Sequence, residues 1–168
     1  LTIGGDAVGG NTLTATLINL VDPDGTGPIT YKWERAGVIV QSSPINTYLL
    51  GPSDVGKAIK VIASYTDGYK YTENVTSLET VAVTKPVNTG PTGEVTITGT
   101  AVGRETLTAN LINFADVDGL GPITYQWKRD GVVVQSTAVN KYLLSPDDVD
   151  KVITVQATYI DLYHRPES

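Results

Sequence analysis

The chain has 168 residues, of which 40% are hydrophobic and 18% are charged, and its formal net charge is −6 at pH 7. These proportions are typical of a folded protein, and the length suits one large domain or two small ones. The negative charge argues against binding to nucleic acid or to an anionic membrane surface, because both need a basic face. The absence of cysteine excludes disulfide frameworks, thiolate catalysis and cysteine-ligated zinc.

The chain carries no sign of membrane insertion or of a signal peptide. No apolar run approaches the roughly 20 residues that span a bilayer. The first ten residues, LTIGGDAVGG, contain neither a basic region nor an initiator Met, so we expect a mature fragment of a longer protein. A Thr-, Val- and Gly-rich acidic chain without Cys fits a bacterial secreted or surface protein, so we expect an extracellular or cell-surface location.

Apolar and polar residues alternate with a period of two in the first part of the chain, which predicts half-buried β-strands. The alternation runs over residues 12–17, 29–34 and 59–65, and short Gly-, Pro- and Asp-rich turns separate these segments. No segment shows a convincing helical period. Roughly seven short antiparallel strands in a unit of this size predict an all-β protein built as a β-sandwich.

The same sequence then recurs at an offset of 94 residues without a gap. Residues 1–74 align with residues 95–168, and 43 of the 74 pairs are identical, which indicates two tandem copies of one domain. We predict repeat 1 at residues 1–85, a short Pro/Gly linker at residues 86–93 and repeat 2 at residues 94–168.

The last strand of the two copies differs. Residues 75–83 of copy one, VTSLETVAV, predict a last strand, whereas the sequence given ends at Ser168, before the equivalent residues of copy two. One interpretation is that the chain continues beyond this point. The alternative is an open sheet edge that a strand from another chain fills, as in a strand-complemented filament.

Aromatic residues mark the predicted core of each copy. Trp33 and Trp127 each lie in a strand that is followed by Arg, one further residue and Gly, then by a Tyr-Leu-Leu strand and an Asp-Val pair. This pattern resembles an immunoglobulin-like fold, with the two tryptophans in the third strand. The aromatic residues expected in the core are Tyr31, Trp33, Tyr65, Tyr125, Trp127 and Tyr159.

A longer string, TLTA…D-x-DG-x-GPITYQWKRDG…YLL…DDV…ITV-x-ATY-x-D, resembles the immunoglobulin-like repeats of very large bacterial surface adhesins, often described as cadherin-like or RTX-associated. The resemblance covers both copies. It implies two immunoglobulin-like β-sandwiches within a long array, acting as a structural spacer or in cell adhesion, with neighbouring repeats of the same chain as partners. The linker lacks the D-x-N-D-N run of true cadherins, and the usual cysteine pair is missing.

Acidic residues recur in the loops that are expected at one end of each sandwich. They are Asp22, Asp24, Asp67 and Glu73 in copy one, and Asp116, Asp118, Asp161 and Glu167 in copy two. Calcium takes six to eight oxygen ligands, so one prediction from these carboxylates is a Ca²⁺ site. The alternative is structural, because Asp accepts hydrogen bonds from turn amides and Gly supplies a positive φ. We expect no other cofactor.

Nothing in the sequence indicates catalysis. His164 is the sole histidine, copy one has Lys70 in its place, and no G-x-S-x-G motif is present. Tyr65, Tyr69 and Tyr71 lie near the acidic loops, where aromatic side chains can contact a glycan or a protein partner. The function expected is therefore a non-catalytic spacer or adhesion module. The alternatives are a virion-associated module of a phage capsid or tail, a strand-complemented filament subunit, and a calcium- or glycan-binding module.

Overall fold

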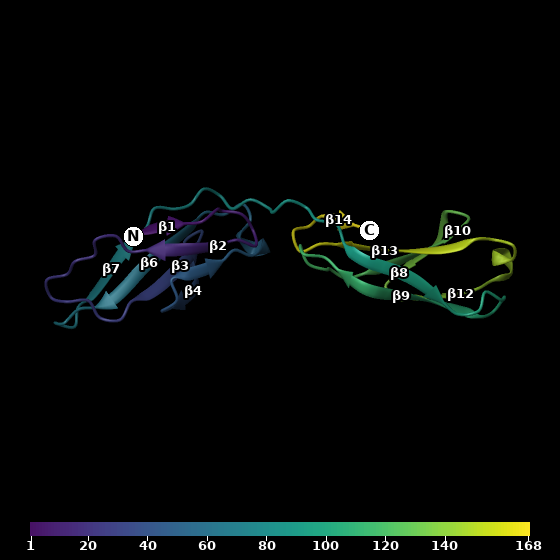
Figure 1. Cartoon of the computed structure of the whole chain (residues 1–168), viewed down its shortest axis with the longest axis horizontal. Coiled ribbons are helices and arrows are strands. Elements are labelled where there is room, and N and C mark those ends of the chain that lie inside the picture. Colours follow the sequence, from purple (N-terminus) through teal and green to yellow (C-terminus); the bar gives the residue numbers. More distant parts are fainter. The chain divides into compact units, whose positions relative to one another are not determined.

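All regular structure in the chain is β-strand, apart from two single-turn 3₁₀ helices. The computed structural model describes residues 1–168 and divides into two units, unit 1 (Leu1–Pro86) and unit 2 (Val87–Ser168). Each unit contains one three-stranded and one four-stranded antiparallel sheet (Figure 1). This confirms the predicted all-β fold with two tandem immunoglobulin-like β-sandwiches. The two helices are single 3₁₀ turns and too short to span a bilayer.

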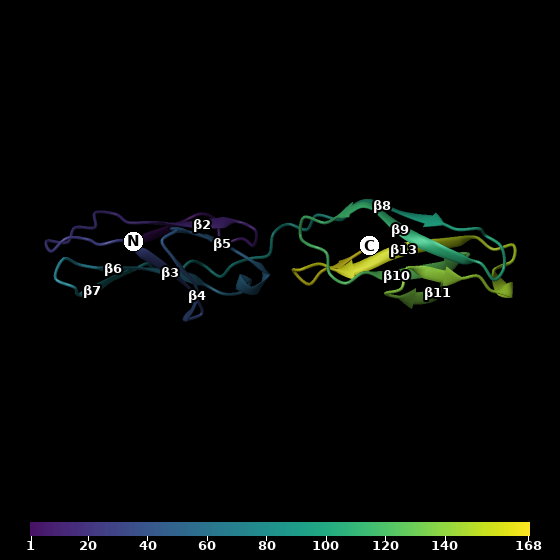
Figure 2. The same ribbon diagram turned by 90° about the horizontal axis from the view of Figure 1, so that it is seen from below.

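Unit 1 has the strand order of an immunoglobulin sandwich. Its smaller sheet has the order β1 (Thr2–Gly4), β2 (Thr12–Thr16), β5 (Thr47–Leu49), and its larger sheet has the order β4 (Val38–Ser43), β3 (Thr30–Arg35), β6 (Ile59–Thr66), β7 (Thr72–Thr76). The 3₁₀ helix η1 (Pro52–Asp54) connects β5 to β6. First, second and fifth strands in one sheet, facing the third, fourth, sixth and seventh in the other, match immunoglobulin connectivity. Figure 2 shows the two layers from the side.

Unit 2 repeats this architecture. Its sheets have the orders β12 (Lys141–Leu143), β9 (Thr106–Ala115), β8 (Thr92–Thr98) and β11 (Val132–Thr137), β10 (Thr124–Arg129), β13 (Ile153–Ile160), β14 (Pro166–Glu167), with η2 at Pro146–Asp148. Registers agree as well, since Trp33 pairs with Val61 and Trp127 with Val155, and a bulge follows each tryptophan. Thr92 and Gly93, the last two residues of the predicted linker, already belong to β8.

Each core is centred on its tryptophan. Trp33 and Trp127 are fully buried, Tyr65 and Tyr159 are buried, and Tyr31 and Tyr125 are half-buried and pack against the core. Two tyrosines that the sequence analysis left out, Tyr48 and Tyr142, stack on the tryptophans from the opposite sheet, with ring centroids 5.6 and 5.5 Å apart. Their inward positions follow from the alternation of the short β5 and β12 strands.

The last strand of each unit begins earlier than the sequence pattern predicted. β7 covers Thr72–Thr76, and residues 77–84 continue along β6 through separate hydrogen bonds without forming a regular strand. Glu73 and Glu167, expected in the loop before this strand, instead lie within β7 and β14, paired with Tyr65 and Tyr159. That prediction was wrong because the loop is a tight turn, which the Asp67 N–H closes on the Tyr71 carbonyl at 2.9 Å.

Repeat 2 also keeps more of this strand than expected. The sequence predicted that repeat 2 lacks its last strand, but β14 supplies two residues of that strand, which pair with the end of β13.

Behind each stacked tyrosine lies a buried carboxylate. Asp54 is 2% exposed; it accepts hydrogen bonds from the Tyr48 hydroxyl at 2.9 Å and the Gly51 N–H at 2.7 Å, and Arg35 lies 3.0 Å away. Burial and the hydrogen bond to Asp54 raise the pKa of Tyr48 to about 12. Since Arg35 comes from β3 and Tyr48 from β5, the carboxylate links the two sheets.

The equivalent carboxylate of unit 2, Asp148, has more donors. Arg129 Nε lies at 2.7 Å, the Tyr142 hydroxyl at 2.9 Å, and the Ser145 N–H and hydroxyl at 2.7 and 2.9 Å. Burial acts to raise the pKa of Asp148, but the hydrogen bonds from Ser145, Arg129 and Tyr142 outweigh it and hold the pKa well below its ordinary value. A lowered pKa in the folded state means that ionised Asp148 stabilises unit 2.

Replacing this carboxylate tests its contribution. We expect Asp148→Asn to lower the free energy of unfolding of unit 2 by about 3 kcal/mol, because Arg129 loses its buried partner. Asp147→Asn is the matched control, since the Asp147 side chain is 83% exposed, and it should change stability by less than about 0.5 kcal/mol. Urea unfolding followed by tryptophan fluorescence measures both. Equal effects of the two substitutions would contradict this role for Asp148.

The lowered pKa of Asp148 predicts that the stability of unit 2 decreases as the pH falls. Because the pKa of Asp148 is lowered on folding, its stabilisation is present above the ordinary Asp value of about 3.9 and is lost as the pH falls below it. We therefore expect the unfolding temperature of unit 2 to fall steeply below about pH 4, and less steeply in Asp148→Asn. Parallel pH profiles of the two proteins would contradict the expectation.

Candidate functional site

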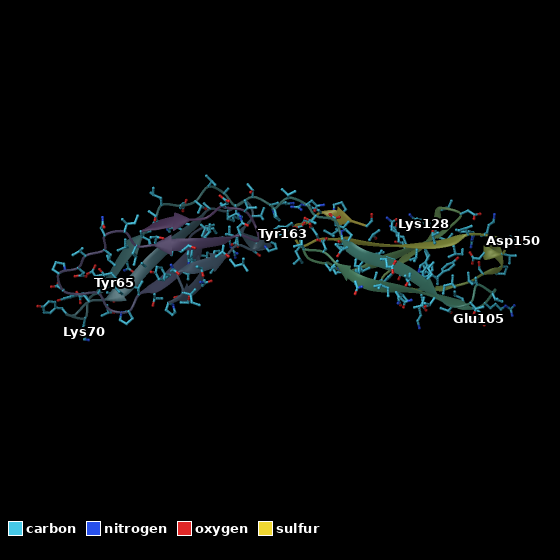
Figure 3. The ribbon with its side chains drawn as sticks, in the orientation of Figure 1. Tyr65, Lys70, Glu105, Lys128, Asp150 and Tyr163 are labelled. Atoms are coloured by element: carbon cyan, nitrogen blue, oxygen red, sulfur yellow. The ribbon has the colours of Figure 1, made fainter.

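The acidic loops of each unit meet at one end of its sandwich. In unit 1 the loop between β2 and β3 contacts the turn between β6 and β7, where the Gly68 N–H donates to the Asp24 carbonyl at 3.0 Å. A Cβ on Gly27 would collide with the Thr66 carbonyl, so the close approach of these segments requires glycine. Figure 3 places Tyr65 and Lys70 at this end of unit 1 and Tyr163 at the equivalent end of unit 2.

The first aspartate of each loop is occupied by structural hydrogen bonds. One carboxylate oxygen of Asp22 accepts the Asp24 N–H at 2.9 Å, and the other accepts the Tyr65 hydroxyl at 2.9 Å. Asp116 does the same with the Asp118 N–H and the Tyr159 hydroxyl. The pKa of Tyr65 is raised mainly by its hydrogen bond to Asp22 and secondly by burial. The pKa of Tyr159 is raised mainly by burial and secondly by its hydrogen bond to Asp116. These aspartates fix the turn and attach it to the sixth strand of the unit.

The aspartate that follows that strand closes the neighbouring turn. Asp67 accepts the Tyr71 N–H at 2.8 Å, and Asp161 accepts the Arg165 N–H at 2.7 Å. Both carboxylates are buried. The sequence pattern placed both aspartates in loops but did not predict that they are buried.

The eight predicted calcium ligands therefore divide into turn-forming aspartates and strand-borne glutamates. Across residues 1–168, no three His, Asp or Glu side chains are grouped so that they could hold a metal ion. The loop aspartates direct oxygens toward tyrosine hydroxyls and backbone amides. This is the turn-stabilising role that the sequence offered as the alternative to calcium binding. Calcium binding stays a prediction for these loops.

In unit 2 the loop end also binds the linker. The Thr89 N–H donates to Asp118 Oδ2 at 2.8 Å, Arg165 Nη1 donates to Asn88 Oδ1 at 2.6 Å, and Asn88 Nδ2 donates to Glu167 Oε1 at 2.7 Å. Arg165 Nη1 lies 3.4 Å from Asp118 as well. We refer to these five residues as the linker clasp.

The clasp changes the environment of its aspartate. Asp118 is 6% exposed, whereas Asp24, at the equivalent position of unit 1, is exposed. Arg165 stands where unit 1 has Tyr71. The sequence pattern indicated Asp118 and Glu167 but not Asn88, Thr89 or Arg165. The one signal that it contained was the exchange of Tyr71 for Arg165 between the copies.

Unit 1 has a hollow at its loop end. It measures about 340 Å³ and is lined by residues including Asp24, Thr26 and Lys70. Tyr69 and Tyr71, in the adjoining turn, are 71% and 68% exposed. In unit 2 the larger Leu162 replaces Gly68, and its side chain lies against Gly119.

His164 lies in the turn between β13 and β14. Its side chain is exposed, and its backbone N–H donates to the Asp161 carbonyl at 3.1 Å. Its φ of 62° matches the φ of 75° at Lys70 in copy one, so the residue occupies a left-handed turn position.

The chain was compared with known proteins. No protein-family model matches it, and no curated protein sequence matches it significantly. The resemblance to bacterial adhesin repeats consequently stays a prediction from the sequence pattern.

The linker clasp can be tested through its central acceptor. We expect Asp118→Ala to lower the free energy of unfolding of unit 2 by about 1–2 kcal/mol, because the Thr89 N–H loses its partner, and to accelerate hydrogen exchange of the Thr89 amide. Asp24→Ala is the matched control, since no linker residue contacts Asp24. NMR-detected exchange of the Thr89 amide provides the readout. An unchanged rate in Asp118→Ala would show that the hydrogen bond does not hold the linker.

Proposed function

We propose that the chain is a structural spacer and adhesion module, without catalysis, in a long repetitive extracellular bacterial protein. The two immunoglobulin-like sandwiches, repeated with the same register and core, support this proposal. So does the acidic surface, because net negative charge keeps extended proteins soluble and apart. The partners proposed are neighbouring repeats of the same chain.

The observation that carries the proposal is the length of the tether between the units. Thr84 is held in unit 1, where its N–H donates to the Ala7 carbonyl at 2.9 Å and its carbonyl accepts the Gly9 N–H at 2.9 Å. Asn88 is held in unit 2 by the linker clasp. Only residues 85–87 separate these two anchors, one of them a proline.

Such a tether limits how far the units can separate. An extended chain spans at most about 3.6 Å per residue, so the Cα atoms of Thr84 and Asn88 can be no more than about 14 Å apart. A spacer benefits from this limit, since each additional repeat then adds a nearly fixed length. A flexible Gly/Ser linker of many residues would instead allow the array to collapse.

Measured distances between the units test the spacer function. The chain has no cysteine, so Val21→Cys with Asp147→Cys, both at exposed positions, allows specific spin labelling. We expect double electron–electron resonance to give a narrow distribution of distances between the two spin labels. Inserting eight Gly/Ser residues between Lys85 and Pro86 should broaden it. A native distribution as broad as that of the insertion variant would contradict the spacer proposal.

A second candidate function, glycan binding, is favoured by one feature of unit 1. The hollow beside Asp24 and Lys70 adjoins two highly exposed tyrosines, and aromatic rings beside polar side chains suit the apolar face and the hydroxyls of a sugar. The equivalent place in unit 2 is occupied by Leu162. Binding would therefore be confined to unit 1.

A glycan array tests this candidate. We expect any bound glycan to be lost in Tyr69→Ser and in Tyr71→Arg, the latter introducing the residue that unit 2 carries. His164→Lys is the matched control in unit 2 and should leave binding unchanged. Retention of binding in both tyrosine variants, or absence of binding by the native chain, would exclude a glycan site in the hollow.

A further inference from the structure

The larger sheet of each unit ends at a strand that is paired on one side only. β4 is the outermost strand in unit 1, where it pairs with β3, and β11 holds the same place in unit 2, where it pairs with β10. Figure 1 shows β4 at the margin of its sheet, and Figure 2 shows β11 beside β10. The backbone groups that face away from β3 and β10 therefore have no strand partner.

Both of these edge strands lack the residues that normally discourage pairing between proteins. Their sequences, VIVQSS (Val38–Ser43) and VVVQST (Val132–Thr137), contain no charged residue and no proline. Every other edge strand of the two units is either at most three residues long or carries a glutamate. Short length, charge and proline are the usual protection of an exposed edge, so β4 and β11 are the least protected edges of the chain.

Apolar side chains are exposed along the same edge. Val38 and Val132 are 65% and 68% exposed, and Ile39 and Val133 are 51% and 47% exposed. The segment that follows adds two more exposed apolar residues in each unit, namely Ile45 and Leu49 in unit 1 and Val139 and Leu143 in unit 2. We refer to these four positions of each unit, together with β4 or β11, as the apolar edge.

A glutamine side chain determines which strand is open on this side of the sandwich. Gln41 Nε2 donates to the Thr47 carbonyl at 2.8 Å, and Gln135 Nε2 donates to the Lys141 carbonyl at 2.8 Å. These bonds join the larger sheet to β5 and β12 of the smaller sheet and occupy a carbonyl of each short strand. β4 and β11 are therefore the strands that can accept a new partner here.

The absence of acidic residues from the apolar edge favours a second copy of this chain as its partner. The chain has a net charge of −6, so two copies repel each other unless they meet at a surface without free carboxylates. The carboxylates of the two hairpins that carry the edge, Glu34 and Asp130, form ion pairs with Lys60 at 2.8 Å and Lys151 at 3.0 Å. A second copy also presents an uncharged strand of the same length with the same unpaired backbone groups.

We propose that the apolar edge is a contact surface between two copies of this chain, at which β4 or β11 pairs antiparallel with the same strand of the second copy. A two-fold axis lets each strand supply the donors and acceptors that the other lacks, and the exposed apolar side chains of both edges are then covered. The partner is thus a separate chain and not a neighbouring repeat. The proposal does not rest on the spacer function, since it needs only the edge of a folded unit.

Sedimentation equilibrium of the purified full chain tests the proposal. We expect reversible self-association with a Kd on the order of 0.1–1 mM, because a six-residue edge that is interrupted by a bulge buries less area than a standard interface. Ile39→Lys with Val133→Lys should raise the Kd by about tenfold or more, because like charges would face each other across the contact. A native chain that stays monomeric at about 1 mM would overturn the proposal.

Two matched variants distinguish the edge from a general effect of charge. Val21→Lys with Val117→Lys adds the same charge at positions that are 83% and 82% exposed in the acidic loops, and it should leave the Kd unchanged. Ile39→Val, which gives unit 1 the residue of unit 2, should also leave it unchanged. Equal Kd values for the edge and loop lysine variants would overturn the proposal.

Hydrogen exchange of the native chain locates the contact without any substitution. We expect the amides of residues 38–43 and 132–137 to exchange more slowly at high than at low protein concentration, and those of β7 to be unaffected. Added salt should strengthen the association, because it screens repulsion between the acidic chains. Concentration-dependent protection elsewhere than at β4 and β11, or weaker association at high salt, would overturn the proposal.

Discussion

Each sandwich depends on a chain of contacts that leads from the central tryptophan to a buried carboxylate and its arginine partner. In unit 1, Trp33 stacks on Tyr48, whose hydroxyl donates to Asp54, and Asp54 in turn binds Arg35. Trp33 and Arg35 belong to β3, whereas Tyr48 belongs to β5 in the other sheet. The stack and the ion pair therefore fix how the two sheets face each other. A buried carboxylate is tolerated only because its hydrogen bonds are satisfied.

The sequence was sufficient to predict the class, the repeat and the position of the tryptophans, because alternation and an ungapped offset report directly on strands and tandem domains. It could not predict that Asp54 and Asp148 are buried, since an aspartate in a Pro-x-Asp turn sequence is normally expected to be exposed to solvent. It also misplaced Glu73 and Glu167, because the tight turn closed by Asp67 and Asp161 is shorter than the pattern suggested. Burial of charge depends on partners that are distant in sequence.

The two copies differ at the loop end of each sandwich. The clasp residues Asn88, Thr89 and Arg165 join the linker to unit 2, a role that sequence composition did not reveal because Pro and Gly indicate only a break between domains. Unit 1 keeps an open hollow and exposed tyrosines at the same end. The proposed spacer function rests on the short tether of residues 85–87 between the anchors Thr84 and Asn88.

Hydrogen bonds to Asp118, Arg165 and Glu167 make Asn88 and Thr89 part of the folded body of unit 2, which leaves a tether of three residues. Backbone ¹⁵N relaxation of residues 84–89 tests it most directly. The account predicts order parameters of about 0.85 for Thr84, Asn88 and Thr89, as in rigid strands. Order parameters below about 0.6 at Asn88 and Thr89 would contradict it, because the linker would then be a flexible connection.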